Sequence, residues 1–379
     1  MKARIDALLN AAVERGASDL HLRAGVPPIV RVNGEMHRLP EPPIAVADLS
    51  EMIAASMDEA TRAEFAEHLD ADYAYDLVPV GRFRVNVLHD RRGPAAVFRH
   101  IPAQIATVES LGLSIDVQRV CELRRGLVLV TGPTGSGKST TLCALIDQIN
   151  RTRREHIVTI EDPIEFVHQD IRCVVTQREV GAHTRSFRRA LRAALREDPD
   201  VVLIGEMRDL ETMSIALETA ETGHLVFGTL HTTTATAAVD RIIDQYPTDQ
   251  QDQIRTMLAD TLVAVIAQTL CRRIDGGRVA AREVMFNTPA VANLIREGKA
   301  FQIASIMQTS RAHGMITLNA ALEALVDQRV IDAAEAHSHA IDKPALLAAL
   351  RRKGVPLLGI EDPAGSRGQA LLGTQRVAI

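Results

Sequence analysis

The chain has 379 residues, a formal net charge of −5 and 46% hydrophobic residues. That length exceeds one typical domain, so we expect two or three domains with ample apolar side chains for buried cores. The acidic balance argues against a globally basic nucleic-acid-binding protein, and the 3% aromatic content argues against base-stacking platforms. We therefore expect no nucleic-acid partner.

The cysteine spacing and the lengths of the apolar runs indicate the cellular compartment of the protein. The chain contains Cys121, Cys143, Cys173 and Cys271, which are widely separated and form no CxxC pair. This spacing indicates neither a zinc knuckle nor a disulfide framework and favours a reducing compartment. No segment approaches the roughly 18 consecutive apolar residues of a membrane span, and the N-terminus lacks the regions of a secretory signal. The sequence thus predicts a cytoplasmic protein, or one held peripherally at a membrane through partners.

The first hundred residues predict a small α+β domain. Apolar residues recur at helical spacing over 1–16, and alternation predicts a strand at 19–22. An Asn33-Gly34 pair predicts a hairpin between strands at 29–32 and 36–39. One or two helices over 46–68 and strands at 71–77, 82–89 and 95–101 complete the domain. Residues 102–114 lack a clear period, so we expect them to link this domain to the next.

From about Ile115 strands alternate with helices, which favours an α/β domain with a parallel sheet and helices on both faces. Apolar strands are expected at 127–131, 156–160, 173–177, 201–205, 225–230 and 279–285. Helices are expected at 139–150, 186–197, 211–222, 235–245 and 250–271. Beyond Pro289 short helices continue to about Lys353, and residues 354–379 are expected to form a mobile tail.

A glycine-rich turn joins the strand expected at 127–131 to the helix that follows. Its residues satisfy the G-x-x-x-x-G-K-[ST] pattern of a phosphate-binding loop, in the strand–turn–helix context that this pattern needs. Small residues let backbone N–H groups surround an anion, and the helix directs its positive end at the phosphates. We expect Lys138 to reach the β- and γ-phosphates of ATP and the Ser139 hydroxyl to bind Mg²⁺. The expected nucleotide-binding residues are Gly132, Pro133, Thr134, Gly135, Ser136, Gly137, Lys138, Ser139 and Thr140. A glycine-rich turn that binds nothing is disfavoured.

Two of the expected strands end in carboxylates. The strand at 201–205 runs into Glu206, which would deliver its carboxylate to the Mg²⁺ shell. The strand at 156–160 runs into Glu161, Asp162 and Glu165, any of which can orient or deprotonate the water that attacks the γ-phosphate. Without such roles, these acids would be a surface glutamate at the end of a strand and a solvated acidic loop.

Histidines and arginines are further candidates for the site. His231 follows the strand at 225–230 on the side where the phosphate-binding loop opens, so it is a candidate γ-phosphate sensor, whereas His224 lies at the other end. Histidines in such places are more often structural. Arg82 and Arg84 share one strand face and are candidates for arginines that a neighbouring subunit supplies to phosphate. They could equally form a solvated strand face that discourages aggregation.

Seven runs of residues support a resemblance to a known family. They are GASDLHLRAGVPPIVRVNG from Gly16, RFRVN from Arg82, GPTGSGKSTT from Gly132, TIEDPIEFVH from Thr159, ALREDPDVVLIGEMRD from Ala194, ETGHLVFGTLHT from Glu221 and NLIREGK from Asn293. Over about 1–342 the chain resembles the type II and type IV secretion ATPase superfamily, in its branch of type IV pilus retraction ATPases. The resemblance implies a PAS-like domain at 1–101 and a RecA-like P-loop NTPase domain with short C-terminal helices at 115–353.

The resemblance also implies a function. It implies a homohexameric motor that hydrolyses Mg-ATP and powers pilus retraction and twitching motility by pilus disassembly, at the inner face of the cytoplasmic membrane. Its implied partners are an inner-membrane pilus platform protein and a second retraction ATPase. By similarity, Glu165 is the catalytic glutamate, Glu206 is the acid of the Mg²⁺ strand, and His224 and His231 belong to a histidine box. Arg82 and Arg84 fall in the stretch that supplies arginines to a site shared between subunits.

One residue departs from the family pattern. Ala292 stands where the family's NLIRE motif is preceded by an arginine, so the resemblance supports ATP hydrolysis more strongly than coupling to the pilus. A pilus assembly or type II secretion ATPase is disfavoured, because the chain has no CxxC pair and begins directly with the small domain. Three further functions are disfavoured: an accessory retraction ATPase, by the GEMRD run at Gly205 and the FGTLHT run at Phe227; a nucleic-acid motor, by the acidic pI and the scarce aromatic residues; and a nucleotide-binding scaffold. Glu165 and Glu206 argue against the scaffold, which needs neither.

Overall fold

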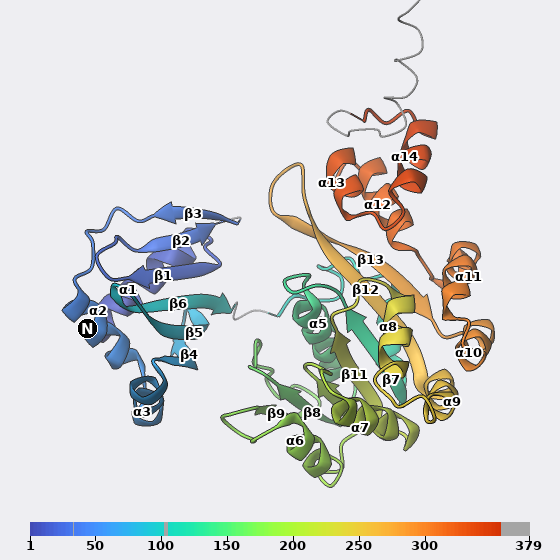
Figure 1. The fold of residues 1–379 in the computed structure, drawn as a ribbon, viewed down its shortest axis with the longest axis horizontal. Helices are drawn as coiled ribbons and strands as arrows, with labels where there is room; N and C mark the ends of the chain where they lie inside the picture. Colours follow the sequence, from blue (N-terminus) through green and yellow to red (C-terminus); the bar gives the residue numbers. More distant parts are fainter. Residues whose placement is uncertain (33, 102–104, 358–379) are drawn as a thin grey trace, which may run out of the picture. The chain divides into compact units, whose positions relative to one another are not determined.

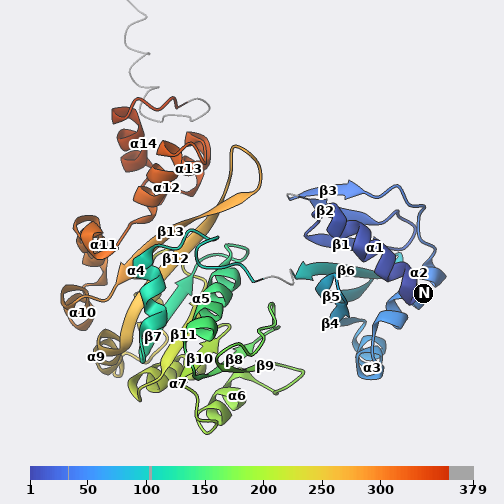
Figure 2. The same ribbon diagram turned by 180° about the vertical axis from the view of Figure 1, so that it is seen from behind.

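The computed structural model describes residues 1–32, 34–101 and 105–357. These residues form two β-sheets, seen from opposite sides in Figures 1 and 2. By their contacts the described residues group into two compact units, one within 1–112 and 139–205 and the other within 113–138 and 206–357. Asn33 of the expected hairpin, residues 102–104 of the expected linker and residues 358–379 of the expected tail lie outside the described residues.

The first sheet has six strands in the order β3-β2-β1-β6-β5-β4, and every neighbouring pair is antiparallel. Its strands are β1 (Asp19–Arg23), β2 (Ile29–Val32), β3 (Glu35–Arg38), β4 (Asp70–Leu77), β5 (Gly81–Asp90) and β6 (Gly93–Ile101). The helices α1 (Lys2–Glu14), α2 (Val46–Ser56) and α3 (Glu59–His68) complete this region. Apolar side chains of α1 and α2 pack with inward-facing strand residues such as Leu20, Val85 and Phe98 in one core. The expected elements of this region are confirmed.

The second sheet has seven strands in the order β13-β12-β7-β11-β10-β8-β9. They are β7 (Gly126–Thr131), β8 (His156–Glu161), β9 (Val174–Glu179), β10 (Val201–Ile204), β11 (Leu225–Leu230), β12 (Leu262–Arg272) and β13 (Arg278–Phe286). Pairing is parallel between β12 and β7, β7 and β11, β10 and β8, and β8 and β9, whereas β13 joins β12 antiparallel. Every residue of β7, β10 and β11 is buried, as in a parallel sheet covered on both faces.

One helix precedes the strands of the second sheet and the others lie between them in the chain. These helices are α4 (Ile115–Gln118), α5 (Lys138–Thr152), α6 (Phe187–Ala194), α7 (Leu210–Glu221), α8 (Ala235–Ile243) and α9 (Gln251–Thr261). In Figure 1 α8 lies in front of β7, and in Figure 2 α4 does, so both faces are covered. Short helices continue the chain as expected: α10 (Pro289–Arg296), α11 (Ile303–Thr309), α12 (Leu318–Asp327), α13 (Ala333–His339) and α14 (Lys343–Arg352). None of the described helices combines the length and the apolarity that crossing a membrane requires.

The prediction of a single helix over 250–271 is wrong for its second half. The helix α9 ends at Thr261, and the next eleven residues form β12. No glycine or proline separates the two elements, so the sequence carries no break signal at their junction. The residues of β12 are mostly buried and pair with β7 on one side and β13 on the other. This burial between two strands favours the extended conformation for the apolar run.

Candidate nucleotide-binding site

The phosphate-binding loop follows β7 and requires glycine at its first position. Gly132 has a φ of +146°, and a Cβ there would lie 2.2 Å from the carbonyl oxygen of Gln268 and 2.6 Å from Ser136 Oγ. Gly135 and Gly137 also have positive φ values, +79° and +88°. These are conformations that side chains with a Cβ disfavour. The loop therefore has the shape in which successive backbone N–H groups turn inward.

Hydrogen bonds to the second sheet hold the loop. Gln268 on β12 donates from Nε2 to the carbonyl oxygen of Ser136 at 2.8 Å, and the N–H of Gly132 donates to Leu230 O at the end of β11 at 3.3 Å. Lys138 Nζ donates to Gly132 O at 2.9 Å and to Pro133 O at 3.1 Å. The ammonium thus lies over the loop, bonded to carbonyl oxygens that phosphate oxygens can replace.

Two hydroxyls of this region are buried without a hydrogen-bond partner among the described residues, Thr131 Oγ1 and Ser136 Oγ. Buried polar atoms are normally paired, so these two indicate a polar ligand beside the loop. Ser139 and Thr140 follow in the first turn of α5 and are half-buried. The N–H groups of a first helical turn have no intrahelical acceptor and suit phosphate oxygens. The loop and the start of α5 together can bind a polyphosphate.

Glu206 follows β10 and forms an ion cluster with two neighbours. Its Oε1 accepts a hydrogen bond from Arg208 Nε at 2.7 Å and lies 2.8 Å from His231 Nε2. The N–H of Met207 donates to Thr229 O on β11 at 3.1 Å, which fixes the residue after Glu206 to the strand that His231 follows. Arg208 and then His231 lower the pKa of Glu206, whose burial acts in the opposite direction. Glu206 is therefore a carboxylate at neutral pH.

The acids after β8 differ in burial and in partners. Glu161 is only 7% exposed, and its Oε1 accepts hydrogen bonds from Thr159 Oγ1 at 2.6 Å and Gln177 Nε2 at 3.1 Å. Burial raises its pKa above the ordinary value for glutamate. Asp162 is exposed and Glu165 is half-buried. Glu161 is thus engaged inside the fold, which leaves Asp162 and Glu165 as the candidates for activating water.

The remaining expected residues, His224, Arg82 and Arg84, contact neighbouring backbone or charged groups. His224 Nδ1 lies 3.1 Å from Thr219 O, at the opposite end of β11 from the phosphate-binding loop, so its contacts are structural. Arg82 and Arg84 share a face of β5, as expected, while Phe83 between them points into the core. Asp76 and Asp72 on β4 lie 3.8 Å from the Nε atoms of Arg82 and Arg84 respectively, and Glu179 Oε2 at the end of β9 lies 3.5 Å from Arg82 Nη2.

Sequence reasoning missed two residues of the site. The incorrect prediction of a helix at 250–271 concealed the role of Gln268. A predicted strand there would have placed Gln268 beside β7. Arg208 was visible two residues after Glu206, but spacing alone does not show that its side chain turns back onto Glu206. Both bonds depend on side-chain direction, which follows from the tertiary fold.

The chain is similar over most of its length to proteins of known function. The model of the family "Type II/IV secretion system protein" matches residues 1–355. The chain is 51% identical over 336 residues to the type IV pilus retraction ATPase PilT of Pseudomonas aeruginosa, which covers 89% of this chain and 98% of that protein. It is 42% identical over 334 residues to the type IV pilus ATPase PilU of the same organism, covering 88% and 87%. A crystal structure of the pilus retraction motor PilT with bound ADP matches with a TM-score of 0.85 and 46% identity, covering 91% of this chain and 99% of that one.

Proposed function

This chain belongs to the type II/IV secretion system protein family, and on that premise we propose that it is an ATPase motor that powers retraction of type IV pili. The observation that carries the proposal is the 51% identity to PilT over 98% of that protein, because nearly every part of a retraction ATPase then has a counterpart here. The lower identity to PilU, 42%, makes an accessory role in retraction the second candidate.

ATP is the proposed substrate, with Mg²⁺ as its metal. The oxygen donors of Ser139 and Glu206 suit Mg²⁺, which prefers hydroxyl, carboxylate and phosphate ligands. When bound there, it would neutralise negative charge on the phosphates. Lys138 would exchange the carbonyl oxygens of Gly132 and Pro133 for phosphate oxygens. The loop N–H groups and the first turn of α5 would hold the remaining phosphate charge.

Water activation is assigned to Glu165. Glu161 is buried and bonded to Thr159 and Gln177, so its carboxylate already has its partners. Glu165 is half-buried four residues further on, and we propose that its carboxylate orients the attacking water and accepts its proton. His231 is then a positioning residue, since it holds the Glu206 oxygen that it contacts.

The assembly we propose is a homohexamer in which one subunit completes the site of the next. Arg82 and Arg84 would supply positive charge to the phosphates of a neighbouring subunit. Arg84 pairs with the exposed Asp72 at 3.8 Å, and an exposed pair of this length contributes little stability, so phosphate could replace Asp72 at small cost. Arg82 lies 3.8 Å from the exposed Asp76 and 3.5 Å from the more buried Glu179, so its release would separate a less exposed ion pair. We also propose contacts with an inner-membrane platform protein and a second retraction ATPase, at the inner face of the cytoplasmic membrane. The proposed domains are a PAS-like one at 1–101, a linker at 102–114 and a RecA-like one at 115–353, before a tail at 354–379.

The first test is steady-state ATP hydrolysis by the purified chain, together with its mass in solution. We expect Mg²⁺-dependent turnover by a ring of about six subunits and its loss in Glu206→Gln. Lys138→Ala should weaken ATP binding, whereas Glu165→Gln should bind ATP normally and turn over about 10²-fold more slowly or worse. Normal turnover by Glu165→Gln would move water activation to Asp162. A monomer without turnover would favour a nucleotide-binding scaffold.

The second test separates retraction from an accessory role. The gene for this chain is expressed in a twitching bacterium from which its own retraction ATPase has been deleted, with Glu165→Gln as the inactive control. Restored twitching by the wild-type chain alone supports the retraction motor. An active ATPase that restores twitching only beside a second retraction ATPase would instead be accessory.

A further inference from the structure

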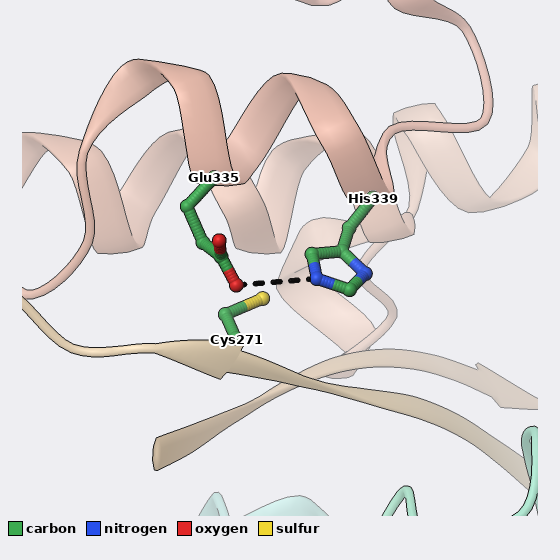
Figure 3. A group of neighbouring side chains, drawn as sticks. All are labelled: Cys271, Glu335 and His339. Atoms are coloured by element: carbon green, nitrogen blue, oxygen red, sulfur yellow. Dashed lines mark hydrogen bonds and ion pairs between the residues drawn. The ribbon is translucent and has the colours of Figure 1, made fainter. Parts of the chain in front are cut away.

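Three side chains of types that can bind metals gather where β12 meets α13, outside the nucleotide site (Figure 3). They are Cys271 on the strand and Glu335 and His339 on the helix. One ligand atom from each lies within 4.8 Å of the other two. Among the described residues, no other group of three histidine, cysteine or acidic side chains comes this close. Cys271 precedes Glu335 by 64 residues and His339 by 68, so no short sequence motif such as CxxC reveals the cluster.

The fold positions each of the three side chains. Glu335 and His339 are four residues apart on α13, so they share one face of the helix. Asp332 caps this helix by accepting a hydrogen bond from Glu335 N at 2.7 Å. Cys271 belongs to the core that β12 and β13 form with α12–α14, and it is fully buried. Figure 3 shows the thiol, the carboxylate and the imidazole turned toward one point.

Neighbouring residues hold two of the ligands in place. Arg272 donates from its backbone N–H to Glu335 Oε1 at 2.7 Å and from Nε to Oε2 at 3.1 Å. Thr269 Oγ1 lies 3.2 Å from His339 Nδ1, which turns Nε2 toward Glu335 Oε1, also at 3.2 Å. In metal sites the ligating histidine is typically fixed through its other ring nitrogen in this way.

We propose that Cys271 Sγ, a Glu335 carboxylate oxygen and His339 Nε2 bind a borderline-soft divalent cation of the Zn²⁺ class. Thiolate, imidazole and carboxylate are the ligands that Zn²⁺ uses in proteins, whereas Mg²⁺ and Ca²⁺ avoid sulfur. Three protein ligands leave the fourth tetrahedral position to a water molecule. The His339 side chain is 31% exposed, which gives a cation a route to the buried sulfur.

Binding exchanges a proton for the cation. Burial, followed by the nearby Glu335, raises the pKa of the Cys271 thiol to about 12, so the thiol keeps its proton without metal. On binding, the S–H bond breaks, the sulfur–metal bond forms and the proton passes to the buffer. The Cys271 thiolate and the Glu335 carboxylate then balance the two positive charges of the cation, and Arg272 Nε keeps its hydrogen bond to Glu335 Oε2.

The cation would tie the C-terminal helices to the strand that supports the phosphate-binding loop. Gln268, three residues before Cys271 on β12, donates to the loop at Ser136. A bound cation would join this strand to α13, and so stabilise the fold in proportion to its concentration over its Kd. The proposal does not depend on the proposed pilus function.

The test is a titration of the full-length, tag-free chain with Co²⁺ after chelator treatment, followed by competition with Zn²⁺. We expect one Co²⁺ per chain, a thiolate-to-cobalt charge-transfer band, displacement by Zn²⁺ and a higher melting temperature with metal. Cys271→Ser should lose the band, and His339→Gln should weaken binding at least tenfold. Thr269→Val should weaken it about 10-fold to 100-fold, the usual effect of removing a group that orients a ligand.

Controls separate metal binding from misfolding. Cys173→Ser removes another buried cysteine outside the cluster and should leave the band and the stoichiometry unchanged. Melting of each metal-free variant shows whether it folds, and His339→Gln changes a partly exposed residue that folding should tolerate. Absence of a thiolate band in a folded wild-type chain would overturn the proposal. A band that persists in Cys271→Ser, or disappears in Cys173→Ser, would do so as well.

Discussion

Glu206 Oε1 lies 2.8 Å from His231 Nε2, and the same oxygen accepts a hydrogen bond from Arg208 at 2.7 Å. These residues follow β10 and β11, two strands whose ends the Met207–Thr229 backbone bond also joins. Both side-chain contacts that position Glu206 are therefore made by its Oε1 atom. Arg208 and the contact with His231 keep the Glu206 carboxylate ionised and oriented, and a charge that is oriented in advance needs little reorganisation during a reaction.

If Glu206 serves the Mg²⁺ shell as we propose, His231→Ala should slow ATP turnover by about 10-fold to 100-fold, because removing a group that orients such a carboxylate typically costs that much. ATP affinity should change little, since the phosphate-binding loop keeps its own contacts. The measurement is kcat at saturating ATP together with the Mg²⁺ concentration for half-maximal rate, which should rise. His231→Gln can still donate to Glu206 and should recover part of the rate. Equal losses in both variants would mean that the imidazole acts on something other than Glu206.

Arg208→Ala should move the acidic limb of the pH–rate profile to higher pH. Arg208 is the largest cause of the lowered pKa of Glu206, so without it the carboxylate takes up a proton at a higher pH. In the wild-type chain the ion pairs stabilise the fold above the ordinary pKa of a glutamate, and this contribution disappears as the pH falls through the lowered value. Arg208→Lys should give an intermediate profile. An unchanged acidic limb in Arg208→Ala would show that another group sets it.

Gln268→Ala should loosen the phosphate-binding loop. The variant leaves the Ser136 carbonyl oxygen without the Gln268 donor, and an unpaired buried acceptor costs about 1–3 kcal/mol. We expect a lower melting temperature and a raised Kd for ATP, measured by titration with a fluorescent ATP analogue. Gln268→Glu should be worse than alanine, because a carboxylate would face a carbonyl oxygen. Normal ATP affinity in both variants would show that the loop does not need this bond.

Gly132→Ala should abolish ATP binding. Its Cβ would meet backbone at 2.2 Å, a contact that the loop can relieve only by moving away from β12. Gly181→Ala is the matched control, because Gly181 also has a positive φ, +91°, but open space around it and a place outside the loop. Backbone strain should lower the melting temperature of both variants, whereas ATP binding should fail only in Gly132→Ala. Binding lost equally in both would point to general destabilisation.

The strongest local patterns in the sequence predict most of the secondary structure and part of the candidate site. The glycine-rich turn between a buried strand and a helix predicts the loop without tertiary information, because one short segment contains all of its parts. The strand ends at Glu206 and His231 are likewise visible, since apolar runs stop there. Their mutual contact is not, because it depends on which strands are neighbours.

Where sequence reasoning failed, tertiary pairing decided the outcome. Residues 262–271 have apolar side chains at spacings that fit a helix as well as a strand, and only their position between β7 and β13 makes them a strand. This error also affected the prediction of two side-chain contacts, because Gln268 and Cys271 both lie on β12. With β12 taken as a helix, neither the bond to Ser136 nor the cluster with Glu335 can be foreseen.

Ala292→Arg restores the residue type of the family motif, and we expect it to destabilise this chain. Ala292 is 7% exposed and lies on the buried face of α10 with Val291 and Ile295, where α10 packs against α9. Forcing a long side chain into a packed core costs about 1–3 kcal/mol, and a buried charge adds to that cost. The melting temperature should therefore fall, without a gain in twitching when the variant replaces the wild-type chain.

Asn293→Arg is the matched control for this change, because Asn293 is the exposed neighbour on the same helix. It should lower the melting temperature far less, although it removes the hydrogen bond from Asn293 Nδ2 to Glu297 at 2.7 Å. If Ala292→Arg kept its stability and increased twitching, position 292 would face a partner rather than the core. In that case, the alanine at position 292 would weaken the coupling of ATP hydrolysis to the pilus. If Ala292→Arg instead destabilises the chain, α10 is packed around the smaller residue.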